Sequence, residues 1–181
     1  MSGPLVVVAV RPEAAYLHDV DVVLTGIGKV AAAVAVSRAI AERQPSFVLN
    51  VGTAGALRDG LEGVHRIGRV LEHDVDHAAL GALIGEDLSG EIVLDTGEPW
   101  ILATGDAFVA DERVRQALAE RAHLVDMEGY AIARACAAAS VPCELVKVVS
   151  DTASEGAARS WKEQADVTAR TIAEVVAARL A

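Results

Sequence analysis

Two short apolar runs flank an alanine-rich stretch near the start of the chain, and this order constrains the fold more than any other feature. The run from Asp21 to Thr25 is expected to be a strand, and Gly26-Ile27-Gly28 breaks the chain after it. From Lys29 to Arg43, alanines and valines recur at helical spacing, which predicts a helix that packs on a sheet. Phe47–Val51 is expected to be the next strand. Strand, glycine turn, helix and strand form a βαβ unit, whose strands are parallel and whose crossover is right-handed.

The rest of the chain continues the alternation of strands and helices. Leu5–Val10 predicts a buried strand that ends at Arg11-Pro12, and Glu13–Val20 leaves room for one or two helical turns. Further strands are expected at 66–75, 91–94, from 101 and at 143–149, and helices at 111–121, 128–140 and 159–180. No period of 20 to 50 residues repeats and no low-complexity linker divides the chain. We therefore expect one domain over residues 1–181, built as a three-layer α/β/α structure.

Composition limits the class of partner. At 181 residues and 52% hydrophobic, the chain is about one domain long and can bury a core. The net charge of −10 argues against a nucleic-acid partner, which needs a basic surface, and 3% aromatic residues offer few stacking platforms for single strands. A small neutral or cationic ligand fits this composition better.

The N-terminal segment and the two cysteines carry no signal for export or for a metal. Met1–Val10 has no basic leader before its apolar run, so we expect neither a signal peptide nor a membrane span, and a cytoplasmic protein. Cys136 and Cys143 have no metal-binding spacing and are expected to be buried reduced thiols.

Acids and glycines follow several of the predicted strands. In parallel α/β sheets, ligands bind beyond the carboxyl ends of the strands, so these positions are candidates for a site. Glu128 opens a predicted helix and Asp151 follows a buried strand, which would let two acids converge on one polar ligand. The other positions of this kind are Arg11-Pro12-Glu13, Gly26-Ile27-Gly28, Gly52-Thr53-Ala54-Gly55, Gly105-Asp106-Ala107-Phe108-Val109 and Ser150.

Two other kinds of site are suggested by short motifs and disfavoured by their context. The segment from Gly26 to Ala31 matches the GxGxxG/A dinucleotide pattern, but the next strand ends at Asn50-Val51-Gly52 without the acid that would bind a ribose. A P-loop is excluded because Val30 follows Gly28-Lys29. His73-Asp74-Val75-Asp76-His77 resembles a metal site, but on a strand the histidines and the aspartates would face opposite sides. We expect a solvated or interface strand there, and no bound metal.

Five motifs in this order resemble the purine nucleoside phosphorylase/nucleosidase superfamily, and within it the 5′-methylthioadenosine/S-adenosylhomocysteine nucleosidases. They span about four fifths of the chain: 26–33, Asn50-Val51-Gly52-Thr53-Ala54-Gly55, Thr104-Gly105-Asp106-Ala107-Phe108-Val109, Asp126-Met127-Glu128 and Ser150-Asp151. The resemblance implies a nucleoside phosphorylase-like fold with a central mixed sheet. It also implies cleavage of a purine N-glycosidic bond without metal or organic cofactor.

The same resemblance assigns roles to individual residues. Asp151 would be the acid that protonates purine N7, and its place after an apolar strand favours the protonated form. Glu13 would activate the attacking water, and Glu128 would accept hydrogen bonds from the ribose hydroxyls, with Met127 packing against the sugar. Phe108 and Val109 would bind the purine, and the rest of the substrate site would be Ser150, Thr53, Ala54 and Gly55. Asp151 as a turn cap, Glu13 as an exposed acid and Glu128 as a first-turn acid of a helix remain structural alternatives.

Some positions depart from the family pattern. Asp126 stands where a longer Glu is usual, Lys147 where an Arg is usual, and the segments after Glu13 and from Gly85 to Gly97 are short. A phosphate site would need more basic residues than Arg58, Lys29 and Arg11, so hydrolysis is favoured over phosphorolysis. A phosphorylase, a futalosine-type hydrolase and a nucleoside-binding protein without turnover remain alternatives. Relatives of this kind usually assemble, and we expect a homodimer.

Overall fold

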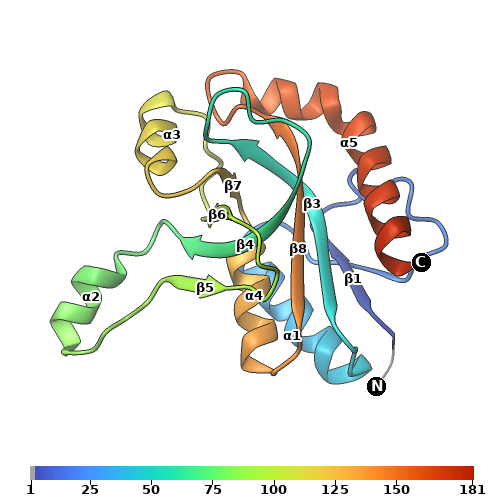
Figure 1. Cartoon of the computed structure of the whole chain (residues 1–181), viewed down its shortest axis with the longest axis horizontal. Coiled ribbons are helices and arrows are strands. Elements are labelled where there is room, and N and C mark those ends of the chain that lie inside the picture. The colour runs from blue at the N-terminus through green and yellow to red at the C-terminus, as the bar shows by residue number, and fades with distance from the viewer. Residues whose placement is uncertain (1–2) are drawn as a thin grey trace.

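Eight strands in the described part of the chain form one mixed sheet, which confirms the predicted α/β class (Figure 1). The computed structural model describes residues 3–181, so Met1 and Ser2, the first residues of the segment expected to lack a leader, lie outside it. The strands are β1 (Leu5–Val8), β2 (Val22–Leu24), β3 (Val48–Ala56), β4 (Val64–Glu72), β5 (Glu91–Val93), β6 (Trp100–Thr104), β7 (Leu124–Asp126) and β8 (Cys143–Asp151). The helices are α1 (Lys29–Arg43), α2 (His77–Ile84), α3 (Glu112–Ala119), α4 (Gly129–Ala138) and α5 (Ala157–Leu180).

The sheet has a parallel part that continues into a closed ring of strands. β2, β1, β3 and β8 pair in parallel, as the predicted βαβ unit requires. β3 also pairs with β7, β7 with β6, β6 with β4 and β4 with β8, which returns the ladder to β3. The pairings of β3 with β7 and of β4 with β8 are antiparallel, so the sheet is mixed.

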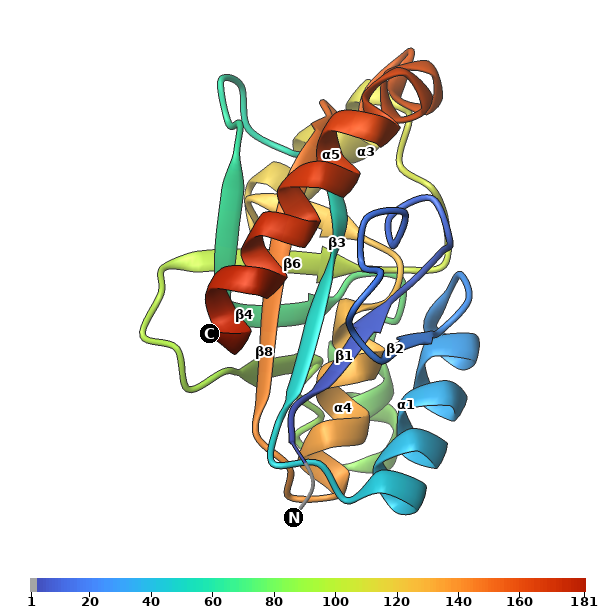
Figure 2. The ribbon, with the colours of Figure 1, turned by 90° about the vertical axis from the view of Figure 1, so that its right-hand side faces the viewer.

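Helices cover both faces of this sheet (Figures 1 and 2). α1 and α4 pack together on one face, where Val36, Ile40 and Ile132 lie against Leu5 and Val7 of β1. On the other face, Ile172 and Val176 of α5 lie against β1, β3 and β8. The three-layer arrangement expected from the alternation of elements is therefore present.

Most predicted elements are found, and the corrections lie at strand ends and in the middle of the chain. α1 has the bounds expected of it, whereas β1 is shorter than Leu5–Val10. Gly52–Gly55 was expected to follow the strand that ends at Val51 but belongs to β3, which pairs there with β8. β7 and α2 were not predicted. The segment after Glu13 forms turns instead of a helix, held by bonds such as Ala14 N to Arg11 O at 3.1 Å.

The strand expected over His73 to His77 is absent. β4 ends at Glu72 and α2 begins at His77, so the histidines and aspartates of this segment do not alternate between two faces of a strand. Asp76 instead caps α2, because its side chain accepts a hydrogen bond from Ala79 N at 2.9 Å.

Candidate active site

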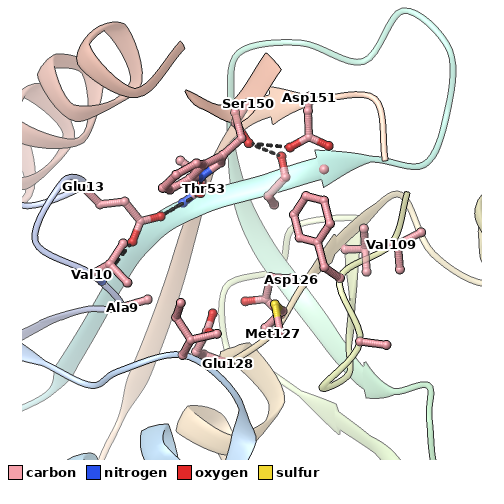
Figure 3. Close-up of a pocket in the computed structure, with 17 residues that line it drawn as sticks. Ala9, Val10, Glu13, Thr53, Val109, Asp126, Met127, Glu128, Ser150 and Asp151 are labelled. Carbon is pink, nitrogen blue, oxygen red and sulfur yellow. Dashed lines mark hydrogen bonds between the residues drawn. The ribbon is translucent and has the colours of Figure 1, made fainter. Parts of the chain in front are cut away.

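A cavity of about 230 Å³ opens at the carboxyl ends of β1, β3 and β8 (Figure 3). This is the edge of the sheet where the sequence predicts a ligand site. All the residues expected to form the site contribute to its lining: Glu13, Thr53, Ala54, Gly55, Phe108, Val109, Met127, Glu128, Ser150 and Asp151. The structure thus brings together residues from positions 13 to 151.

Glu13 is held by the turn after β1 and points across to β3 (Figure 3). Its Oε1 accepts hydrogen bonds from the Thr53 backbone N–H and hydroxyl, both at 2.7 Å. Its Oε2 accepts one longer bond, 3.4 Å, from Val10 N. The side chain is buried, with 5% of the residue exposed. The alternative that Glu13 is an exposed acid is therefore wrong.

Asp151 is the last residue of β8, and its carboxyl lies beside Gly55 of β3. Its Oδ1 accepts a hydrogen bond from Ala153 N at 2.8 Å, and its Oδ2 accepts one from the Ser150 hydroxyl at 2.8 Å. The bond from Ala153 N, two residues along the chain, makes Asp151 the cap of the turn after β8, as the structural alternative expected, whereas the N-cap of α5 is Gly156. Asp151 remains part of the cavity wall, where it can also meet a ligand.

Glu128 immediately precedes α4, but its side chain does not cap that helix. The first amides of α4 are satisfied from elsewhere: Gly129 N donates to Asp126 Oδ2 at 2.9 Å and Tyr130 N to Thr104 Oγ1 at 2.9 Å. The carboxylate of Glu128 is therefore free to accept a bond from Gly28 N at 2.9 Å and to face the cavity. The glycine motif of Gly26–Gly28 thus positions Glu128.

Asp126, which lines the cavity, forms a buried ion pair with Lys147, which does not. Lys147 Nζ lies 2.9 Å from Asp126 Oδ2, and each side chain is only 2% exposed. The other oxygen of Asp126 accepts a 2.6 Å bond from the Thr104 hydroxyl. Burial lowers the pKa of Lys147, but the charge and the hydrogen bond of Asp126 outweigh it and raise the net pKa. The two departures from the family pattern, a shorter acid and a shorter base, therefore contact each other.

The pKa of Glu128 is raised to about 7, chiefly by burial and next by the negative charge of Asp126. The hydrogen bond from Gly28 and the charge of Lys147 act in the opposite direction. Glu13 adds a smaller repulsion, so three carboxyl groups share the field of one ammonium. A ligand that donates hydrogen bonds to Glu128 would favour its ionised form.

Phe108, Val109 and Met127 supply apolar side chains to the cavity lining. Val109 is buried, with 7% exposed, whereas Phe108 is 49% exposed. An exposed ring beside a cavity can pack on a flat heteroaromatic ligand.

Trp161 is a cavity residue that the sequence did not predict, as are Ala9, Val10 and Val125. It lies in α5, and its indole Nε1–H donates to Thr53 Oγ1 at 3.0 Å. The one signal in the sequence is that tryptophan is rare in this chain, which has two.

No group of three or more His, Cys, Asp or Glu side chains within residues 3–181 is arranged to hold a metal ion. In the cluster that resembled one, Lys29 Nζ binds Glu72 at 2.5 Å and Asp74 at 2.6 Å, and His77 Nε2 lies 2.8 Å from Glu72. This cluster joins the first turn of α1 to the start of α2. No helix of the described chain is long and apolar enough to cross a bilayer.

Comparison with known proteins identifies relatives across most of the chain. A family model described as the phosphorylase superfamily matches residues 14–82 and 98–181. The 5′-methylthioadenosine/S-adenosylhomocysteine nucleosidase of Staphylococcus aureus is 30% identical, over 91% of this chain and 84% of the relative. The corresponding nucleosidase from Neisseria meningitidis, solved with methylthio-immucillin-A, has a TM-score of 0.86 and 27% identity, over 98% of this chain and 97% of that one. A futalosine hydrolase mutant of Helicobacter pylori shares the fold, with a TM-score of 0.87 at 22% identity over 97% of each chain.

Proposed function

Because this chain belongs to the phosphorylase superfamily, we propose that its cavity is the active site of a purine nucleoside N-ribosylhydrolase. The observation that carries the proposal is the convergence of Glu13, Glu128 and Asp151 on one cavity of about 230 Å³. The similarity to 5′-methylthioadenosine/S-adenosylhomocysteine nucleosidases supports a substrate of that type. The reaction consumes one water and releases the purine base and the free sugar.

We propose one role for each of the three acids. Asp151, protonated, donates its proton to purine N7 as the C1′–N bond breaks, so the base leaves as a neutral molecule. Glu128 accepts hydrogen bonds from the ribose hydroxyls, and its negative charge stabilises the positive charge that develops at C1′. Glu13 accepts a proton from the water whose oxygen bonds to C1′. Phe108, Val109 and Met127 supply apolar contact to the base and the sugar.

Water is favoured over phosphate as the nucleophile because the cavity offers no cation to an anion. Among the described residues that line it, none is Arg or Lys. Lys147 lies behind the wall and is neutralised by Asp126, and Lys29 is engaged by Glu72 and Asp74. Phosphorolysis would require a positively charged site for phosphate.

The test is release of free base by the purified protein. We would incubate it with methylthioadenosine, S-adenosylhomocysteine, adenosine, inosine and futalosine, each with and without phosphate. We expect adenine from the first two at a rate independent of phosphate. A requirement for phosphate would make the protein a phosphorylase, and no base from any substrate would leave a nucleoside-binding protein.

Substitution of the proposed acid tests the mechanism directly. Asp151→Asn should lower kcat by at least about 1,000-fold, within the range that general acid catalysis can supply. Affinity for a nucleoside analogue should change little, as measured by isothermal calorimetry. Asp19→Asn, an exposed position outside the cavity, is the matched control. Near-normal turnover by Asp151→Asn would show that another group protonates the base.

We also propose that the protein acts as a homodimer in the cytoplasm. Ile27, Val30 and Val34 leave apolar surface exposed at the start of α1, and Ile27 also lines the cavity. α2 projects from the body of the molecule (Figure 1) and exposes Leu80, Leu83 and Ile84. These six residues form what we call the apolar rim. An exposed apolar surface beside the cavity is typical of an interface with a second subunit.

A further inference from the structure

A chain of hydrogen bonds links helix α5 to the proposed general base. The Trp161 indole Nε1–H donates to Thr53 Oγ1 at 3.0 Å, and the Thr53 hydroxyl lies 2.7 Å from Glu13 Oε1. The three groups come from α5, from β3 and from the turn after β1. They are separated in sequence by 108 and 40 residues.

The chemistry of the three groups fixes the direction of this chain. An indole N–H can only donate, and an ionised carboxylate can only accept. Because the indole occupies one acceptor position of the Thr53 hydroxyl, that hydroxyl directs its single proton to Glu13. A threonine hydroxyl without such a partner rotates among several acceptors.

The two carboxylate oxygens of Glu13 accept hydrogen bonds of unequal number and length, and this difference decides which oxygen can act as a base. Oε1 receives two bonds of 2.7 Å, from the backbone N–H and the hydroxyl of Thr53. Oε2 receives only the 3.4 Å bond from Val10 N. Oε2 therefore retains the capacity to accept a proton from a water molecule, while Oε1 anchors the carboxylate.

We propose that Trp161 is a positioning residue for Glu13, acting through the Thr53 hydroxyl to anchor Oε1 and leave Oε2 for the water. This inference rests on the proposed hydrolase function. Trp161 is also the one residue of α5 in the described cavity lining, so the docking of this helix and the placement of the base are linked. A phenylalanine at this position would supply an aromatic ring but could not donate the hydrogen bond to Thr53 Oγ1.

Kinetics of Trp161→Phe test the proposal, because this change keeps an aromatic ring and removes the N–H. Loss of one hydrogen bond of about 1 kcal/mol predicts a fall in kcat of roughly three- to tenfold. KM should change less than kcat, since the affected group acts on the water. Trp100→Phe is the matched control, because Trp100 lies on β6 outside this cavity and should keep wild-type kinetics.

A double-mutant cycle separates this role from simple packing. In Thr53→Ala, which keeps the backbone N–H but lacks the hydroxyl, adding Trp161→Phe should lower kcat by less than twofold. If Trp161→Phe alone leaves kcat unchanged, or lowers it equally in both backgrounds, the proposal is wrong.

Nuclear magnetic resonance tests the same chain of bonds without turnover. The two indole N–H signals of the ¹⁵N-labelled protein can be assigned with Trp100→Phe, which removes one of them. Glu13→Gln should shift the Trp161 signal although Glu13 does not contact the indole, and Thr53→Ala should abolish that response. An unchanged Trp161 signal would refute the inference even if the protein hydrolyses nucleosides. Absence of turnover with the shift present would refute only the proposed function.

Discussion

Glu128 shows how a single residue of the site links function to stability. With a pKa of about 7, its carboxyl binds a proton more tightly in the folded protein than at its ordinary value of 4.5. The folded state therefore binds more protons than the unfolded chain between about pH 4.5 and 7, and this group lowers stability as the pH rises through that window. The energy involved is roughly 2 to 3 kcal/mol.

Glu128→Gln should remove this pH dependence. The variant should match the wild type in stability near pH 4 and exceed it by roughly 2 kcal/mol at pH 8, while losing most of its affinity for nucleosides. Urea unfolding at a series of pH values would measure the difference. The exposed Glu86→Gln is the control and should follow the wild type at every pH. A stability gain that is constant from pH 4 to 8 would argue against a raised pKa.

The ion pair of Lys147 and Asp126 predicts a strong dependence of each residue on the other. Lys147→Met leaves the Asp126 carboxylate buried without its counter-charge, which costs about 3 to 5 kcal/mol of unfolding free energy. Lys147→Met combined with Asp126→Asn should cost less than Lys147→Met alone, because position 126 then carries no unpaired charge. Urea unfolding at one protein concentration would compare them. Equal losses in the single and double variants would contradict the pairing.

At the residue scale, the sequence could indicate which acids lie at the cavity. It could not indicate all of the side chains that contact them. Glu13, Glu128 and Asp151 could be placed at one edge of the sheet from their positions after strands and from the family resemblance. Asp126 and Lys147 could be recognised only as departures, because their pairing across β7 and β8 depends on tertiary contact. Trp161 stands ten residues past Asp151 within a helix, and nothing local in the sequence connects it to Thr53.

At the scale of elements, the bounds of a helix or strand could be predicted where residues within the element itself determine them. α1 begins after Gly26-Ile27-Gly28 and is amphipathic, so its bounds could be predicted. β3 extends through Gly55 and β8 through Asp151 because residues 52–54 pair with 147–149 and Gly55 pairs with Asp151. Such pairing is not visible in either segment alone. β7 has three residues and was missed because so short a strand depends on its neighbours β3 and β6.

The pairing of β3 with β8 predicts that Gly55 is needed to place Asp151, the proposed general acid. A Cβ at Gly55 would lie 2.9 Å from Asp151 Oδ1 and 3.0 Å from Ala153 Cβ, so Gly55→Ala must displace Asp151 or its strand. A displacement of this kind can lower kcat by up to about 100-fold. Steady-state kinetics would measure it, with Gly3→Ala, whose Cβ would meet nothing within 4 Å, as the control. Wild-type kcat in Gly55→Ala would show that Asp151 tolerates the shift.

At the scale of the whole molecule, the closed ring of strands explains how distant residues share one site. β3 and β8 belong both to the parallel part of the sheet and to the ring, and both end at the cavity. The mixed sheet followed from the family resemblance, whereas strand alternation alone predicted its parallel part. That residues 1–181 form one domain stays a prediction.

The apolar rim predicts the assembly of the whole molecule. The ion cluster of Lys29, Glu72 and His77 ties the first turn of α1 to the start of α2, and both helices carry exposed residues of the apolar rim. Val30 and Leu83 are 75% and 80% exposed in the single chain, and burial of this surface against a second copy would stabilise a dimer. We expect the wild type to sediment at twice its chain mass of 18.8 kDa.

Charge placed in the rim should separate the subunits. Val30→Asp combined with Leu83→Asp should sediment as a monomer with an unchanged circular dichroism spectrum, because both side chains lie on the surface of the single chain. Its KM should rise, since Ile27 joins the rim to the cavity and the second subunit would complete that side of the site. Val167→Asp, 58% exposed on α5 at the opposite face of the sheet, is the control and should remain dimeric. A wild-type mass of 18.8 kDa, or a double variant that stays dimeric, would show that the rim has another role.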